Sequence, residues 1–198
     1  MRKLKLAALG GGLATIAFVL ALAEPASQLF SLHMSQHLLL IAVAAPLLVL
    51  GGLDIPMPAL ASWAIFVGLF LFWHWPSAFQ WAALHPLGEL LELGSILAAA
   101  CCFWSGIFQE GRASAGARAL LVMTAAVVTD LPGVVMLFAP RAICVMPNEN
   151  AARFGLGPLE DQQIAGLLMW VPTNLVFFAI ATFLFARWIA NSSSMVTS

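Results

Sequence analysis

Charged residues are scarce in this chain. Only 9% of its 198 residues are Asp, Glu, Lys or Arg, whereas 62% are hydrophobic and the mean hydropathy is +0.98. A soluble domain carries about 25% charged residues, so this composition excludes an ordinary soluble protein and indicates a membrane protein. The eight basic residues are balanced by nine acidic ones. Without a basic surface to hold a phosphate backbone, nucleic acid is excluded as a partner.

Tyrosine is absent and cysteine is rare. The lack of tyrosine excludes tyrosyl redox chemistry and leaves the aromatic role at the membrane interface to the seven tryptophans. The three cysteines, Cys101, Cys102 and Cys144, contain no Cys-x-x-Cys pair, and two adjacent residues point about 100° apart on any helix. We therefore expect no disulfide framework.

Long apolar runs are what the chain has in abundance. A hydrocarbon core about 30 Å thick takes roughly 20 residues per helix, and six such runs leave no room for a soluble domain. The sequence therefore predicts an all-α, polytopic membrane helix bundle that forms one domain, residues 1–198, with an external loop at residues 140–161. The predicted spans cover residues 6–23, 35–53, 59–75, 86–108, 115–139 and 162–186.

The first run has the features of both an anchor and a signal peptide. Basic residues precede it, and it ends in Ala21-Leu22-Ala23, a small-residue cleavage pattern. Both alternatives stay open. Basic residues accumulate on the cytoplasmic side. With a cytoplasmic N-terminus, six of them are cytoplasmic and two, Arg141 and Arg153, are external. We therefore expect both termini in the cytoplasm.

All four histidines fall on the same predicted side of the membrane. His33 and His37 lie where the second span begins, His74 where the third ends, and His85 where the fourth begins. An ionisable residue inside a membrane is a functional candidate by default, although an interfacial histidine can also bond to lipid headgroups. We expect a histidine-lined pocket that opens outward.

The spacing of His33 and His37 is that of two ligands to one metal ion. An i, i+4 pair places both imidazoles on one helix face, about 6 Å apart. Nearby methionines add thioethers, and imidazole with thioether suits copper, especially Cu(I), although a methionine on an apolar helix is more often packing. The candidate metal ligands are His33, His37, His74, Met34, Met169 and His85.

Three carboxylates accompany these ligands. Glu89 and Glu92 follow His85 at i+4 and i+7, so the three share one stripe of the fourth span. A carboxylate inside an apolar span acts as a metal ligand, a partner of a ligand imidazole, a proton relay or a hydrogen bond between helices. Asp161 opens the last span, where helix capping is its simplest role. We expect all three to orient the imidazoles of the site.

Three stretches of sequence carry a resemblance to a known family. They are His33-Met34-Ser35-Gln36-His37 running into Ala45-Pro46-Leu47-Leu48-Val49-Leu50-Gly51, then Trp73-His74-Trp75-Pro76, and finally Asp161-Gln162-Gln163-Ile164-Ala165-Gly166 with Met169-Trp170-Val171-Pro172. At these residues the chain resembles the multi-span CtaG family (caa3-type) of cytochrome c oxidase assembly factors, over roughly residues 30–186.

The resemblance implies a multi-pass protein of the bacterial inner membrane that acts in respiratory chain biogenesis. Such a protein is not an enzyme. It binds copper, as Cu(I), or presents it at the outer face of the membrane for maturation of a haem-copper oxidase. The implied partners are oxidase subunits or periplasmic copper carriers, together with the lipid bilayer.

The fourth span departs from the family pattern. Relatives typically show His-x-x-Glu-His there, whereas this chain reads Glu89-Leu90-Leu91-Glu92-Leu93 and keeps the second Glu but neither His. The resemblance therefore implies an altered site, in which His85 or Glu89 replaces the missing histidines.

Two other functions are compatible with the residues. Histidines on facing helices, such as His37 and His74, could ligate a b-type haem axially and make the chain an electron carrier. Alternatively, Glu89, Glu92 and Asp130 could relay protons in a small transporter, although no internal repeat supports this.

Overall fold

Helices make up the protein. The computed structural model describes residues 2–21, 29–144, 146 and 150–196, and these contain no strand, which confirms the all-α prediction. The α-helices are α1 (Arg2–Ala21), α3 (Phe30–Leu38), α4 (Ala45–Leu50), α5 (Ala59–Trp73), α6 (Pro76–Leu84), α7 (Pro86–Phe108), α8 (Ala115–Phe138) and α9 (Pro158–Val196), joined by a π-helix η1 (Leu39–Ala44) and a 3-10 turn η2 (Ala151–Phe154).

Five helical segments in the described part are long and apolar enough to cross a membrane. They are α1, the continuous segment α3–η1–α4, α7, α8 and α9. The pair α5 and α6, bent by 72° between the two helices, brings the number to six if it forms one span. The protein is therefore a polytopic membrane bundle of five or six spans, as the apolar runs predicted.

Several helix bounds differ from the predicted spans. The second span begins at Phe30 and not at residue 35, because a carboxylate from another helix caps it, as described below. Residues 76–84, predicted as a connection, form α6. The last helix begins at Pro158, inside the predicted loop 140–161. Residues 22 and 23 of the predicted cleavage pattern, and residues 145 and 147–149 of that loop, lie outside the described residues.

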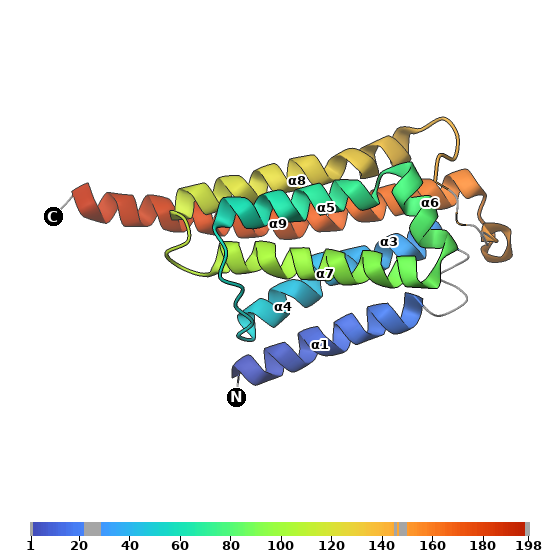
Figure 1. Ribbon diagram of the computed structural model, residues 1–198. Helices are drawn as coiled ribbons and strands as arrows, with labels where there is room; N and C mark the ends of the chain where they lie inside the picture. Colours follow the sequence, from blue (N-terminus) through green and yellow to red (C-terminus); the bar gives the residue numbers. More distant parts are fainter. Residues whose placement is uncertain (1, 22–28, 145, 147–149, 197–198) are drawn as a thin grey trace.

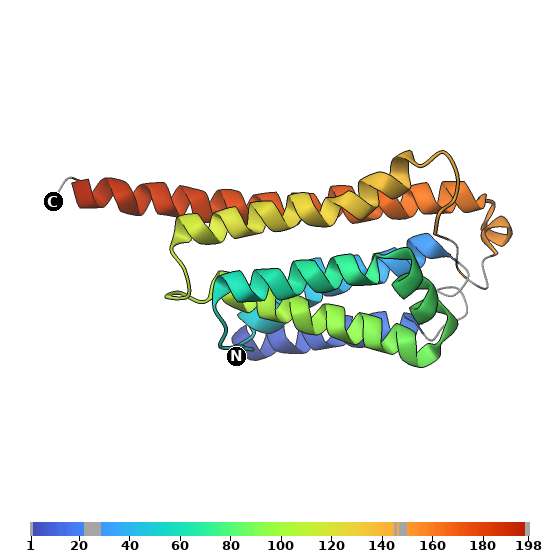
Figure 2. The ribbon, with the colours of Figure 1, turned by 45° about the horizontal axis from the view of Figure 1, so that its top comes forward.

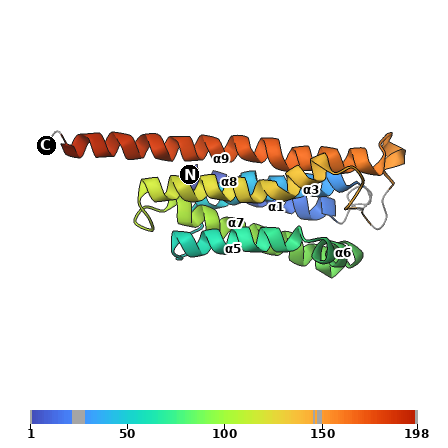
Figure 3. The ribbon, with the colours of Figure 1, turned by 90° about the horizontal axis from the view of Figure 1, so that it is seen from above.

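The helices run nearly along one direction (Figure 1). The first residues of α1 and the last of α9 lie at one end of the bundle, whereas α6 crosses the opposite end (Figures 1 and 2). Helices α8 and α9 form a long pair, α5 lies against α7, and α1 lies at the edge against α4 and η1. Seen from above, α9 extends past the other helices at its C-terminal end (Figure 3).

An aromatic core holds α5, α7 and α9 together. The ring of Phe103 stacks 4.9 Å from Phe66 and 5.8 Å from Phe177, and Trp104 contacts Phe177 edge-on at 5.1 Å. All four side chains are almost completely buried. Offset and edge-on aromatic pairs contribute about 0.5–1.5 kcal/mol each beyond their burial, so this core fixes α7 relative to its neighbours.

A proline and a tryptophan that is distant in sequence account for the π-helix η1. The N–H of Ala45 bonds to Leu40 O, five residues back. In the same pattern residue 46 would bond to Ile41 O, but Pro46 has no N–H. The indole N–H of Trp104 donates to Ile41 O instead, at 2.8 Å. A wider helical turn therefore lies directly after the segment that carries His33 and His37.

Candidate metal centre

His33 and His37 from α3 meet Glu92 from α7 in the interior. Nε2 of His33 lies 3.5 Å from Oε2 of Glu92, and Nε2 of His37 lies 3.4 Å from Oε1. One donor atom from each residue lies within 4.8 Å of the others. Among the described residues these three form the group of His, Cys, Asp or Glu that can hold one metal ion.

The position of the two histidines depends on how α3 begins. Leu29, at the N-cap, has no side-chain acceptor for the first N–H groups of the helix. Asp161 of α9 supplies one: its Oδ2 accepts from Phe30 N at 2.6 Å and its Oδ1 from Ser31 N at 3.1 Å. Asp161 therefore caps a helix 130 residues away in sequence and sets the first turn, which carries His33. The sequence analysis expected Asp161 to orient an imidazole. Its hydrogen bonds in the structure are instead with the backbone N–H groups of Phe30 and Ser31.

Helix α7 supplies the carboxylates. Pro86 at its first turn suits the start of a helix, so Glu89 and Glu92 lie near its N-terminus. Glu89 is 17% exposed, and its Oε1 lies 3.8 Å from Nδ1 of His33. One turn further, Ser95 Oγ accepts from Trp73 Nε1 at 2.8 Å, which ties α7 to the end of α5.

His74 lies at the end of α5 with one ring nitrogen engaged. Its Nδ1 is 2.7 Å from the carbonyl oxygen of Phe70. A carbonyl only accepts, so Nδ1 donates and Nε2 carries the lone pair. Nε2 is buried without a hydrogen-bond partner, and the ring centroid lies 5.5 Å from that of His37. A histidine whose other ring N–H donates to a backbone carbonyl has the usual arrangement of a metal ligand.

Unpartnered polar atoms concentrate at this site. Of twelve buried side-chain nitrogen and oxygen atoms that lack a hydrogen bond in the described part of the chain, eight belong to His33, His37, His74, Glu89 and Glu92. Leaving such an atom unpaired costs about 1–3 kcal/mol. A metal ion bound to imidazole nitrogens and a carboxylate would satisfy several of them together, so the residues present fit a metal.

The cluster is buried, which corrects the expectation of a pocket that opens outward. The side chains of His33 and Glu92 are 0% and 1% exposed and that of His37 is 2% exposed. Phe79 of α6 packs over them, with its ring centroid 5.8 Å from His33 and 5.2 Å from Phe30. The bend between α5 and α6 therefore lays a helix across this end of the bundle.

The two methionines predicted as ligands lie in different surroundings. Met169 of α9 and His37 both line a small cavity of about 20 Å³, together with Thr129. This volume suffices for about one water molecule. Met34 is 1% exposed and belongs to the hydrophobic core, and its role as a ligand stays a prediction.

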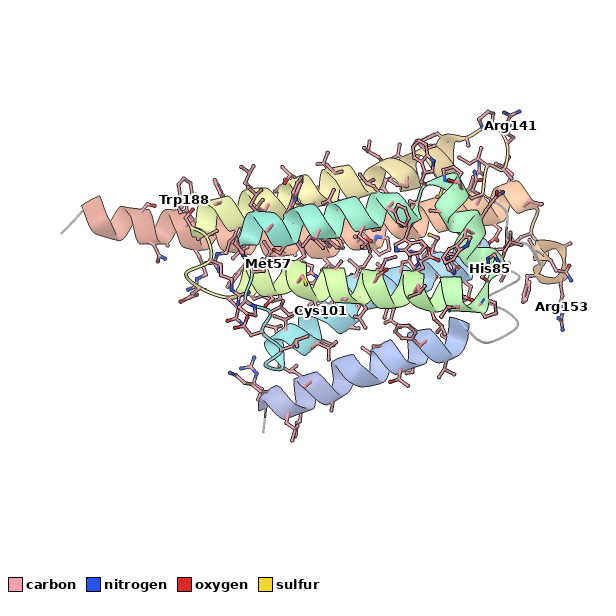
Figure 4. All side chains as sticks on the ribbon, viewed as in Figure 1. Met57, His85, Cys101, Arg141, Arg153 and Trp188 are labelled. Carbon is pink, nitrogen blue, oxygen red and sulfur yellow. The ribbon has the colours of Figure 1, made fainter. Side chains whose placement is uncertain are left out.

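His85 lies away from the cluster. Its ring is exposed, its Nδ1 bonds to Trp81 O at 2.8 Å, and the ring lies 5.5 Å from that of Trp81. Figure 4 shows His85 where α6 joins α7. The shared stripe of His85, Glu89 and Glu92 therefore does not make His85 a neighbour of His33.

Two features of the site were missed in the sequence. Glu92 was expected only to orient an imidazole, yet it lies within reach of both His33 and His37. The partner of His74 is the carbonyl of Phe70, four residues earlier, a spacing that helix geometry makes available.

Near the site's end of the bundle, burial raises the pKa of the Cys144 thiol to about 11. Cys144 is therefore a protonated thiol at neutral pH.

Comparison with known proteins gives one match. The family described as cytochrome c oxidase caa3 assembly factor (Caa3_CtaG) matches residues 53–191. The matched range contains His74, Glu92 and Asp161, whereas His33 and His37 precede it. No curated protein and no solved structure shows a significant match.

Proposed function

Because this chain belongs to the cytochrome c oxidase caa3 assembly factor family, we propose that it binds copper and presents it to a haem-copper oxidase during maturation. Membership makes the chain an oxidase assembly factor, and its apolar helices make it a multi-pass membrane protein. Copper is then a cargo, and the chain is a carrier and not an enzyme.

The observation that carries this proposal is the buried donor set. His33, His37 and Glu92 have one donor atom each within 4.8 Å of the others, and none of these donors has another hydrogen-bond partner. The ring of His74 lies beside that of His37 and has an unpartnered Nε2, and Glu89 adds a second carboxylate beside His33. Carboxylates in an apolar span are costly, and a bound cation would offset that cost.

Imidazole ligands favour copper over the hard cations, and a thioether would favour Cu(I). Met169 borders the cavity next to His37, which supports the proposal of Cu(I) with Met169 as a further donor. Asp161 contributes indirectly, because it fixes the start of the helix that carries two ligands.

We place the protein in the bacterial inner membrane, with the end crossed by α6 on the outer side. The excess of basic residues at the opposite end supports this orientation. The metal cluster would then lie near the outer face, where oxidase subunits or periplasmic copper carriers can reach it.

A b-type haem between His37 and His74 fits less well. The ring centroids are 5.5 Å apart, and the cavity beside His37 measures about 20 Å³. A porphyrin needs far more space, so α3 and α5 would have to separate. Copper requires no such movement.

The test replaces both α3 histidines with glutamine, which fills most of the volume of the buried rings. We expect the double variant H33Q/H37Q to lose its copper and to lower the activity of the client oxidase. The matched control is H85Q, because His85 is exposed and outside the cluster. Metal analysis of anaerobically purified protein, with membrane abundance measured in parallel, gives the answer.

Two results would contradict the proposal. Copper retained in H33Q/H37Q at normal abundance would exclude this cluster as the site. Copper lost equally in H85Q would show that the effect is not specific to the cluster. A second double variant, C101S/C102S, should keep its copper, because Cys101 lies nine residues beyond Glu92 on α7, about 13 Å along the helix axis. Figure 4 shows Cys101 well along α7 from the end that carries His85.

A further inference from the structure

The end of the bundle opposite the metal centre contains a buried arginine with an unused donor. Arg118 of α8 is 8% exposed, and its Nη1 donates to Ile107 O, near the end of α7, at 2.9 Å. Its Nε is buried without a hydrogen-bond partner. A guanidinium has five N–H donors and no acceptor, so this Nε can be satisfied only by a further acceptor.

A cavity of about 270 Å³ adjoins this guanidinium. It is lined by Glu110, Ala115, Arg118, Leu184, Arg187 and Asn191. Arg187 is 53% exposed, and its Nη2 lies 3.5 Å from Oε1 of Glu110, which is itself 76% exposed. The cavity is therefore lined by two arginines and one glutamate, so basic groups outnumber acidic ones. Ala115 is the first residue of α8, where the helix dipole adds positive potential. The cavity is thus suited to an anion.

The same pair of helices carries an apolar groove of about 620 Å³. Leu120 and Met123 of α8 line it, together with Phe185 and Trp188 of α9. The indole ring of Trp188 packs directly on Gly116, where a Cβ would lie 3.2 Å from the ring. Trp188 directly follows Arg187, and Figure 4 shows it at the end of the bundle away from Arg141 and Arg153. Because α8 and α9 are long and apolar enough to span a membrane, a groove between them would face acyl chains.

We propose that this end of α8 and α9 binds an anionic phospholipid. The phosphate is held by Arg118 and Arg187, because guanidinium groups match phosphate geometry with two parallel hydrogen bonds. An acyl chain lies in the apolar groove between the same helices. The inference is independent of copper, since it concerns the opposite end of the molecule.

The test compares two lipids with identical acyl chains. Purified protein is exchanged into nanodiscs of phosphatidylcholine, and retained phosphatidylglycerol is counted by native mass spectrometry. We expect one tightly retained phosphatidylglycerol per chain. A hydrogen bond to a charged group contributes about 1.5–3 kcal/mol, so R187Q should weaken retention at least about tenfold. The control R141Q removes the same charge from the other end and should leave retention unchanged.

A second variant separates a lipid from a free phosphate ion. T182W fills the groove without altering either arginine, since Thr182 is an exposed lining residue. We expect it to weaken retention of phosphatidylglycerol and to leave the binding of inorganic phosphate unchanged.

Three outcomes would overturn the inference. Equal losses in R187Q and R141Q would mean a general charge effect. Inorganic phosphate that competes fully with the lipid, together with no effect of T182W, would identify a phosphate site without a lipid. Equal retention of the two lipids by the unmodified protein would exclude headgroup recognition.

Discussion

At the scale of single residues, the two glutamates of the site differ in how deeply they are buried. Glu92 is 1% exposed and approaches both histidines, whereas Glu89 is 17% exposed and approaches one. A charge in the interior is screened less than one near solvent. The two glutamates lie one turn apart on α7, and we expect them to have unequal effects on a cation bound at the site.

We predict that E92Q lowers the affinity for copper by at least about a hundredfold, because it removes both a donor and the buried charge that offsets the cation. Loss of a group that only orients ligands costs about 10–100-fold, so E89Q should fall within or below that range. Competition titration against a chelator of known affinity measures both. A larger loss in E89Q than in E92Q would contradict the assignment of Glu92 as a ligand.

The sequence predicted that His33 and His37 lie together, but not which other side chains lie beside them. The i, i+4 spacing of His33 and His37 indicated a metal pair, and the structure places them together. His85 was grouped with Glu92 because both lie on one stripe of α7, but seven residues separate them by about 10 Å along the axis. Helix α7 meets the histidines of α3 at the turn that carries Glu89 and Glu92. Which turn does so depends on the packing of helices, and a single helix does not contain that information.

At the scale of elements, the π-helix shows a similar limit. Pro46 is visible in the sequence, but a proline alone predicts a kink as readily as a π-turn. The donor that stabilises the wider turn is Trp104, 63 residues away. Likewise, the sequence analysis ended the third span at residue 75, but it did not predict that the chain would continue as α6, bent by 72° from α5.

We predict that W104F destabilises the protein by about 1–3 kcal/mol, since it leaves the buried carbonyl of Ile41 without a donor. The matched control is W63F, because the indole N–H of Trp63 already lacks a partner. Thermal unfolding in detergent compares the two variants.

The variant P46A separates the hydrogen bond from lost packing, because it restores a backbone N–H at residue 46. W104F/P46A should recover part of the stability lost in W104F. If W63F is as destabilising as W104F and P46A restores nothing, the loss comes from ring volume and not from the hydrogen bond.

At the scale of the whole molecule, the two ends of the bundle differ in charge. Helix α1 begins with Arg2, Lys3 and Lys5 at the end where α9 also terminates (Figure 1). Arg112, in the connection between α7 and α8, pairs there with Asp54. Arg141 and Arg153 lie at the other end (Figure 4). The fold therefore places on one end the basic residues that the sequence analysis assigned to the cytoplasm.

We predict that an impermeant maleimide added to intact spheroplasts labels S77C and not E110C. Both positions are exposed, and they lie on α6 and at the end of α7, at opposite ends of the bundle. The background replaces Cys101, Cys102 and Cys144 with alanine. Labelling of E110C alone would show that the protein has the opposite orientation, with the histidine cluster on the cytoplasmic side.

The cap that Asp161 provides for α3 links the site to the order of protein synthesis. Helix α3 leaves the ribosome early, but the carboxylate that accepts from Phe30 N belongs to α9, 131 residues later. Domains and helices emerge from the N-terminus at about 5–20 residues per second. For several seconds, then, the nascent chain holds His33 and His37 on a helix whose first turn is uncapped. The cap of α3 is complete only after α9 has been synthesised, so we expect any loading of metal to follow translation.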